Sequence, residues 1–147
     1  MLKIVIRIIL GVIMMLGLVV LASACAAKPE DDVAEVRAYA DPITEETLLG
    51  LSEGDYAKYC EHFDPTMKEA VTEAVFNQTN SLIKAKIGDY VSKEFWKVEE
   101  QGIYTIVYYK AKYTKEPGNV VVKVVFQEID GEMHVSGLWF DSPKLRE

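Results

Sequence analysis

The sequence predicts an α+β fold in which N-terminal helices pack on a curved C-terminal antiparallel β-meander of about four strands. From Tyr90 to Phe140, apolar and polar residues alternate in runs rich in β-branched and aromatic side chains, which is typical of strands. Between residues 33 and 88, apolar residues recur at helical spacing, and Asp-Pro pairs and glycines stand where helices begin and end. Helices followed by strands favour an α+β layer architecture.

The helical half begins with two local signals. Val33–Tyr39 predicts one or two helical turns. Asp41-Pro42 predicts the start of a new helix that ends near Ser52, because aspartate caps helices and proline is favoured at their first position. Gly54 then closes this helix.

Two further helices are predicted before the sheet. Asp55 caps a short one. Its apolar face consists of Tyr56, Tyr59, Cys60 and Phe63. Asp64-Pro65 begins a longer helix that runs to about Lys86, and Gly88 follows it. Its predicted buried stripe consists of Met67, Val71, Ala74, Val75, Gln78 and Leu82.

Four strands are predicted, and short turns separate them. The segment 103–113 alternates most clearly, whereas Tyr90–Glu99 alternates weakly. The last two strands are Val120–Ile129 and Met133–Phe140. Asp130-Gly131 between them predicts a two-residue type I′ hairpin, because both residues tolerate positive φ. Turns are also predicted at 100–102 and 116–119, where glycine and proline interrupt the pattern.

Length and charge limit the domain count and the partners. The chain has 147 residues, 16 of them basic and 23 acidic. Lys3 and Arg7 are the only charged residues before Cys25, so the remainder has 14 basic and 23 acidic residues and a net charge of −9. An acidic surface argues against nucleic acid as a partner. Residues 36–147 suffice for a single domain with one core.

Residues 1–24 have the layout of a secretory signal peptide, with two basic residues before an uncharged apolar stretch and small residues after it. The sequence from Leu21 to Cys25 resembles the lipobox of prokaryotic lipoproteins. This resemblance implies a lipid anchor on Cys25 that holds the protein on the extracytoplasmic face of the cell membrane. Residues 25–35 are predicted to be a tether, because the segment after Cys25 is small and charged and has no apolar periodicity. The alternative is an uncleaved anchor, since the apolar stretch is nearly long enough to cross a bilayer.

Several local sequences resemble a protein family of unknown function. They are Gly54-Asp55-Tyr56, the run from Phe63 to Lys68, the break at Gly88 and the ending from Val135 to Leu138. Over roughly 44–140 the chain resembles domain-of-unknown-function family 3887, within the nuclear transport factor 2-like (cystatin-like) superfamily. The resemblance implies a cone, in which the curved sheet surrounds a pocket. It carries over no catalytic residue, because the family has none established and the superfamily contains both enzymes and binding proteins.

Cysteine and histidine offer limited chemistry. Cys60 could act as a nucleophile with His62 as its base, but residues two apart on a helix point in different directions. The prediction for Cys60 is a buried core cysteine. His62 and His134, taken with Cys60, Asp64 or Asp141, lack the tight spacing of metal ligands, so neither a metal nor a cofactor is predicted.

Two hypotheses about function follow. The leading one is a membrane-tethered binding domain without catalytic residues. Its partner would be a small apolar or amphipathic molecule in the cone, another protein, or a second copy that pairs through the sheet. The alternative is a small isomerase-, dehydratase- or hydrolase-like enzyme with a His, Asp or Tyr pocket inside the cone. The predicted pocket residues are Tyr59, Trp96, Tyr104, Tyr108 and His134.

Overall fold

The structure, a computed structural model, describes residues 30–147. The predicted signal peptide, residues 1–24, and the predicted lipidation site, Cys25, lie outside the described residues. Within 30–147, no helix has both the length and the apolar character that a membrane span requires.

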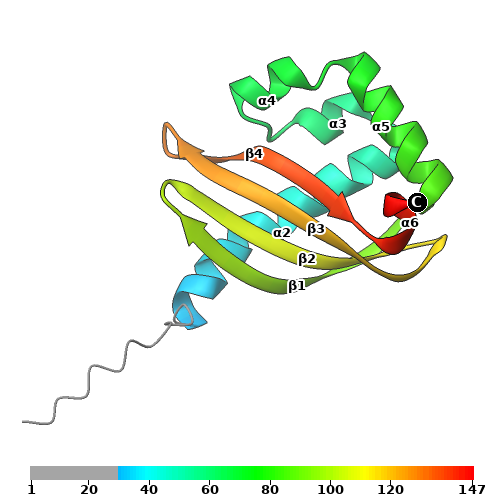
Figure 1. The fold of residues 1–147 in the computed structure, drawn as a ribbon. Helices are drawn as coiled ribbons and strands as arrows, with labels where there is room; N and C mark the ends of the chain where they lie inside the picture. Colours follow the sequence, from blue (N-terminus) through cyan, green and yellow to red (C-terminus); the bar gives the residue numbers. More distant parts are fainter. Residues whose placement is uncertain (1–29) are drawn as a thin grey trace, which may run out of the picture.

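The helices come first and the sheet follows, so the α+β prediction is confirmed (Figure 1). The helices before the sheet are α2 (Glu30–Glu53), α3 (Tyr56–Cys60), α4 (Pro65–Ala70) and α5 (Glu73–Lys86). The strands are β1 (Tyr90–Gln101), β2 (Tyr104–Tyr113), β3 (Glu116–Ile129) and β4 (Glu132–Asp141). A short helix, α6 (Pro143–Arg146), ends the chain.

All four strands form one antiparallel sheet in the order β1-β2-β3-β4, which confirms the predicted meander. The hairpin at Asp130-Gly131 is also confirmed, because both residues have positive φ, 54° and 82°. Of the two other predicted turns, 100–102 is displaced slightly toward the C-terminus and 116–119 is wrong. Gly102-Ile103 joins β1 to β2, and Thr114-Lys115 joins β2 to β3 in place of 116–119.

Backbone hydrogen bonds explain the position of the β2–β3 turn. The amides of Thr114 and Lys115 donate to the carbonyls of Asp89 and Ile87, which fasten the turn to the segment between α5 and β1. Pro117 then lies in an irregular stretch of β3 that has no register partner in β2. Proline is tolerated there because that stretch needs no amide donor for the ladder.

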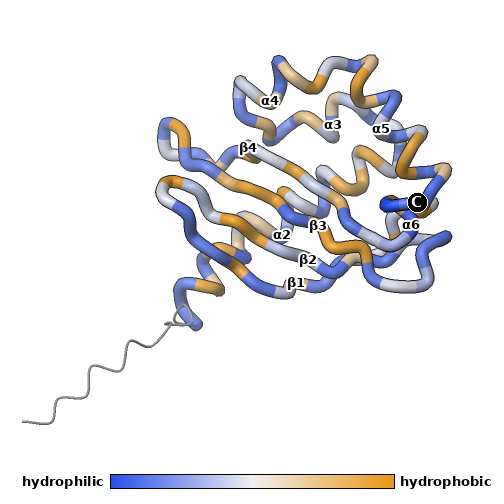
Figure 2. The backbone as a smooth tube through the Cα atoms, in the orientation of Figure 1, coloured by the Kyte–Doolittle hydropathy of each residue, from blue (hydrophilic) through white to orange (hydrophobic). Residues whose placement is uncertain are grey.

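The two faces of the sheet differ in what covers them. The inner face packs against α2, which crosses it in Figure 1, while α3, α4 and α5 lie on the β4 side. The buried inner-face residues of the central strands are Val107, Tyr109, Ala111, Val120, Val122, Val124 and Phe126. From α2 they meet Val36, Ala40, Leu48 and Leu51. Each large apolar side chain contributes roughly 1.5–3 kcal/mol by leaving water. Figure 2 shows that hydrophobic positions are frequent along β3 and sparse along β1.

Helix α2 is continuous, so the predicted break at Asp41-Pro42 is wrong. Proline inside a helix costs about 3 kcal/mol. An unbroken helix offsets this cost because it keeps Val36 and Leu48, on either side of the proline, in one buried face. Asp41 does not cap a helix; its carboxylate accepts a hydrogen bond from the Tyr109 hydroxyl instead.

Helix α2 also begins earlier than predicted. It starts at Glu30, so residues 30–35 of the predicted tether 25–35 are helical. Its first turn contains Glu30, Asp31 and Asp32, whose charges complement the positive end of the helix dipole. The predicted domain boundary at residue 36 therefore falls inside a helix.

The predicted helix 65–86 is two helices, α4 and α5, with a break after Ala70. Thr72 caps α5 by accepting a hydrogen bond from the Val75 amide at 3.3 Å. The Val71 carbonyl accepts the Tyr56 hydroxyl at 2.7 Å, so a tertiary hydrogen bond replaces a helical one at the break.

The break changes which side of the second helix is buried. Helix α5 buries Phe76 and Ile83, not the predicted stripe. Val75 and Leu82 are 42% and 54% exposed, and Ala74 and Gln78 are exposed as well. The predicted stripe is wrong because the prediction treated the segment from Pro65 onward as one continuous helix. The break rotates the second helix, so different residues face the core.

Both predicted aspartate caps of the short helices are confirmed. Asp55 accepts from the Lys58 amide at 3.0 Å, and Asp64 accepts from the Met67 amide at 2.7 Å. Cys60 is buried and free, as predicted. These local signals were reliable because each cap satisfies helix amides that have no intrahelical partner.

Gly50 sets the separation of α2 and α3. A β-carbon at this position would lie 2.6 Å from the backbone nitrogen of Tyr59. Alanine normally stabilises a helix by about 1 kcal/mol relative to glycine. We expect Gly50→Ala to lower the free energy of unfolding instead, by roughly 1–3 kcal/mol, because the backbone of α3 cannot move aside cheaply. Chemical denaturation measures the difference.

Gly118→Ala is the matched control for that prediction. Its β-carbon would come no nearer than 3.7 Å to the Glu116 side chain, so its effect should stay within about 0.5 kcal/mol. Unchanged or increased stability of Gly50→Ala would contradict the close packing of α2 on α3.

Glu116 links the start of β3 to α6 through a buried carboxylate that accepts hydrogen bonds from the amides of Gly118 and Lys144. Burial raises its pKa, but the hydrogen bonds from Ser142 and these two amides outweigh burial, so the pKa lies below its ordinary value of 4.5. A depressed carboxyl pKa stabilises the fold above the unfolded value, and this stability is lost as the pH falls through the folded value.

We therefore expect Glu116→Gln to melt at a lower temperature than the wild type at pH 7, with a gap that shrinks as the pH falls below about 4.5. Thermal unfolding followed by circular dichroism across this range measures the gap. Glu69→Gln, a change at an exposed position on α4, serves as the control. A gap of constant size at every pH would show that ionisation of Glu116 contributes nothing.

Candidate functional site

The interior of the cone contains a tyrosine–aspartate pair. The Tyr109 hydroxyl donates to Asp41 Oδ1 at 2.9 Å, and Arg37 lies 3.0 Å from Asp41 Oδ2. Tyr109 is fully buried, and burial together with the neighbouring Asp41 carboxylate raises the pKa of its hydroxyl. Neither of the two clefts described next is lined by Tyr109 or Asp41. The pair therefore anchors α2 to the sheet and does not face a substrate site.

One cleft, here called the mouth cleft, opens where the first turns of α2 meet the ends of the two β-hairpins. Its volume is about 540 Å³. Its four carboxylates belong to Asp32, Glu35, Glu100 and Glu128. Its other walls come from Val36, Tyr39, Ile103, Thr105 and Met133. The concentration of acidic groups favours cations and disfavours anionic molecules at this end of the cone.

A second cleft, here called the outer groove, lies between α4 and the outer face of the sheet. Its volume is about 490 Å³, within the range typical of ligand pockets. The sheet contributes Tyr104, Val125, Gln127, Ser136 and Trp139. The helical side contributes Asp64, Thr66, Met67 and Ala70. Aromatic and apolar walls with a few polar groups give this groove the composition of a small-molecule site.

Trp139 has the largest exposed side chain of the outer groove, and the residue is 53% exposed to solvent. A β-carbon at Gly137 would lie 2.4 Å from two atoms of the indole ring, so the ring lies directly against the Gly137 backbone. Lys123 Nζ lies 4.8 Å from the ring centroid. Because Gly137 has no side chain, the Trp139 ring can lie against the strand while much of the ring stays exposed.

A second exposed tryptophan lies on the outer face of β1 and β2. Trp96 is 46% exposed, and its ring meets that of Tyr108 edge-on at 6.2 Å. The ammonium groups of Lys97 and Lys110 lie 5.3 Å and 4.7 Å from its ring centroid. Exposed cation–π contacts contribute about 0.5–1 kcal/mol each, so this cluster has a structural role of its own. It lines neither cleft.

The structure separates the five residues predicted to share a pocket. Tyr59 is buried within the helical layer, whereas Trp96 and Tyr108 form the exposed cluster just described. Tyr104 lines the outer groove. His134 lies on β4 opposite Gln127, outside both clefts. Of the five, Tyr104 alone lines either of the two clefts described above.

Trp139, the main aromatic residue of the outer groove, was not among the predicted pocket residues. The signal was present in β4, where Gly137 stands two residues earlier and therefore on the same face of the strand. A glycine next to a tryptophan on one face leaves room for the ring to lie against the backbone. The nearby helix α4 could not be placed from the strand pattern alone.

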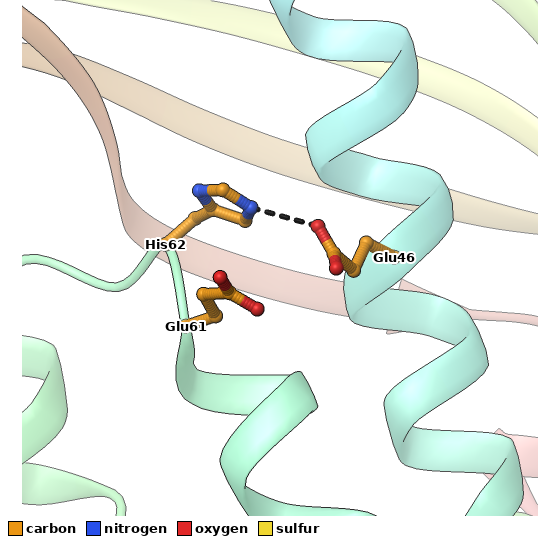
Figure 3. A group of neighbouring side chains, drawn as sticks. All are labelled: Glu46, Glu61 and His62. Atoms are coloured by element: carbon orange, nitrogen blue, oxygen red, sulfur yellow. Dashed lines mark hydrogen bonds and ion pairs between the residues drawn. The ribbon is translucent and has the colours of Figure 1, made fainter.

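Cys60 and His62 do not form a nucleophile–base pair. Burial raises the pKa of the Cys60 thiol, which disfavours the reactive thiolate. His62 Nε2 instead lies 2.9 Å from Glu46 Oε2. Figure 3 shows Glu46, Glu61 and His62 pointing toward one another, and one ligand atom from each lies within 4.8 Å of the others.

The other residues considered with the histidines serve local structure. Asp64 caps α4, and Asp141 forms an ion pair with Arg146 at 2.5 Å. His134 Nε2 lies 4.0 Å from a carboxylate oxygen of Glu132. In the described range, the group suited to hold a metal ion is therefore the one around His62, with Glu46 as a member that linear spacing did not reveal.

Three solved structures are similar to this chain at low sequence identity. A SEC-C motif containing protein from Rhodopseudomonas palustris is 13% identical, with a TM-score of 0.46 over 71% of this chain and 90% of that one. A substituted variant named Rd1NTF2_05 is 16% identical, with a TM-score of 0.48 over 73% and 99%. An NTF2-like protein of unknown function from Cytophaga hutchinsonii is 14% identical, with a TM-score of 0.38 over 73% and 94%. No curated protein matches the sequence.

One family model matches residues 45–138. This stretch runs from the middle of α2 to β4, so it includes the helix caps Asp55 and Asp64 and every residue that lines the outer groove except Trp139. It also contains every local sequence on which the family resemblance was based, and it covers more than half of the chain. The chain therefore belongs to the family DUF3887, proteins of unknown function.

Proposed function

We propose that this protein is a membrane-tethered, extracytoplasmic binding domain that holds a small amphipathic molecule in the outer groove. The observation that carries the proposal is the open aromatic wall formed by Trp139 and Tyr104 in a protein whose interior is filled. A flat apolar part of the ligand would stack on these rings, and its polar part would face the sheet residues beside them.

Exposure of both aromatic residues supports recognition on this face. Trp139 is 53% exposed and Tyr104 39% exposed, although burial of such side chains normally stabilises a fold. Helix α4 lies beside the two rings without covering them. An apolar ligand would bury the exposed ring surfaces and so gain hydrophobic free energy on binding.

Polar groups in the groove would orient the ligand. Gln127 and Ser136 face each other at 3.3 Å, with the Ser136 hydroxyl donating to Gln127 Oε1. Ser136 is the extra residue of a β-bulge in β4, because Phe126 pairs with Val135 and Val125 pairs with Gly137. Bulges re-aim side chains beside binding sites, and here the bulge adds a hydroxyl to an otherwise regular face.

A lipid on Cys25 would hold this domain close to the bilayer. If Cys25 carries the lipid, five residue steps connect it to Glu30 at the start of α2, a reach of at most about 18 Å. The acidic mouth cleft, built on the first turns of α2, would then face the membrane and be repelled by anionic headgroups. The outer groove, on the opposite face of the sheet, stays accessible.

Catalysis by the buried tyrosine–aspartate pair is disfavoured. The enzyme hypothesis needs a His, Asp or Tyr pair that a substrate can reach. The tyrosine–aspartate pair of the interior, Tyr109 and Asp41, lines neither cleft, and the raised pKa of Tyr109 keeps it protonated at neutral pH.

The outer groove can be tested by native mass spectrometry of the full-length protein extracted from its host in mild detergent. We expect a bound molecule on the wild type whose extra mass disappears on denaturation. Trp139→Ala should lose it, because removing a central aromatic contact weakens binding by ~2 kcal/mol or roughly thirtyfold. Trp96→Ala, which changes the other exposed tryptophan, should retain it.

Two results would contradict the groove assignment. Extra mass that persists in Trp139→Ala would place the ligand elsewhere. A dimer that carries no extra mass and dissociates in either tryptophan variant would make the outer face a contact between copies of this chain.

The lipid anchor has a separate test. We expect Cys25→Ser to leave the membrane fraction or to accumulate as an unprocessed precursor, because two acyl chains are what holds a cleaved lipoprotein on the bilayer. Cell fractionation with intact-mass measurement shows which. Cys60→Ser, at the buried cysteine, should keep both the processed mass and the membrane location. Unchanged size and retention of Cys25→Ser would identify an uncleaved anchor.

A further inference from the structure

We propose that Glu46, Glu61 and His62 form a binding site for a divalent transition-metal ion of the Zn²⁺ class. This site is independent of the outer groove, whose lining contains none of the three residues. It also differs from the histidine combinations suggested by the sequence, because its central carboxylate comes from α2.

The three side chains converge from two separate segments. Glu46 lies in the second half of α2, and Glu61 and His62 follow directly after α3 (Figure 3). Their ligand atoms all lie within 4.8 Å of one another, and the shortest separation, His62 Nε2 to Glu46 Oε2, is 2.9 Å. Ligand atoms around a tetrahedral zinc ion at about 2.0–2.2 Å are roughly 3.4 Å apart. Small side-chain rotations therefore suffice to surround an ion.

The backbone on both sides of the site is fixed. The His62 carbonyl accepts the Val135 amide at 2.7 Å, and Phe63, which is fully buried, forms a bridge with the same strand residue. Gly50 allows α2 to approach the backbone of α3 closely, which holds Glu46 opposite the turn that carries the other two residues. A metal ion would meet ligands that the fold has already placed, which lowers the ordering cost of binding.

The charges of the group favour a cation. The Glu61 side chain makes no hydrogen bond or ion pair with any residue of 30–147, although its carboxylate points toward that of Glu46. His62 and Glu46 are 30% and 41% exposed, so water and an ion can reach the site. Two carboxylates beside one imidazole bring acidic oxygens and a ring nitrogen together, and these are groups that bind cations.

The ligand types select the class of metal. An imidazole nitrogen with carboxylate oxygens suits zinc and similar transition metals, whereas calcium and magnesium prefer oxygen ligands alone. Three protein ligands leave a further coordination position for water or for a group on a partner. The competing explanation is an exposed His–Glu hydrogen bond of small energetic value with Glu61 nearby by chance.

The test uses the full-length protein in detergent micelles, titrated with ZnCl₂ and followed through the imidazole NMR signals of its two histidines. We expect one equivalent of zinc to shift the His62 signals and leave those of His134 in place. MgCl₂ at the same concentration should shift neither. Isothermal titration calorimetry supplies the dissociation constant for each variant.

Three variants separate a metal site from a simple ion pair. His62→Asn and Glu61→Gln should each weaken zinc binding at least tenfold. Glu61→Gln is the more informative variant of the two. The Glu61 side chain has no partner within the described residues, so this change should weaken zinc binding without disturbing the fold. Glu69→Gln, an exposed glutamate on α4, should bind zinc as the wild type does. Zinc should also raise the melting temperature of the wild type and not that of His62→Asn.

The proposal is overturned if zinc binds equally well to Glu61→Gln, if it shifts His134 instead of His62, or if no saturable binding occurs. The last result would leave an exposed hydrogen bond between His62 and Glu46 only. Retention of the groove ligand is read from mass spectrometry on the same His62→Asn protein. Failure of the metal site and failure of the groove are therefore separate outcomes.

Discussion

The packing of α2 across the inner face of the sheet is the constraint on which the rest of the structure depends. Asp41 meets the Tyr109 hydroxyl of β2 in the middle of this contact, and Arg37 pairs with the same carboxylate. A break at Pro42 would divide the apolar face of the helix at that point, so tertiary packing outweighs the local cost of proline. The consequence is a cone whose centre is filled by side chains.

A filled centre moves recognition to the surfaces that surround it. The contacts that attach the helices to β4 also build the outer groove. Phe63 bridges to Val135, Asp64 caps α4 immediately afterwards, and α4 then stands beside Trp139. The same short connection carries His62 on its other side, next to α2. One rigid segment thus sets the geometry of two different sites, one aromatic and one charged, which can be altered independently.

The sequence predicted what depends on local chemistry. Alternating strands, the Asp130-Gly131 hairpin and the Asp55 cap were found because neighbouring residues alone decide them. The prediction at Pro42 failed because a distant partner, Tyr109, decides the helix there. The sites were harder still. No rule of spacing joins Glu46 to His62, and the strand pattern does not tell which exposed aromatic residue lies beside a helix.

Hydroxyl-radical footprinting tests most directly whether recognition uses the outer face instead of the interior. The protein would be labelled in its native membranes and again after purification and removal of bound molecules, with oxidation located by mass spectrometry. We expect Tyr109 and Phe126 to stay unmodified in both states, because both are fully buried. Trp139 and Tyr104 become modified only after purification, while Trp96 reacts in both. Modification of Tyr109 and Phe126 that is suppressed in the membranes would contradict recognition on the outer face, because the ligand would then lie inside the cone.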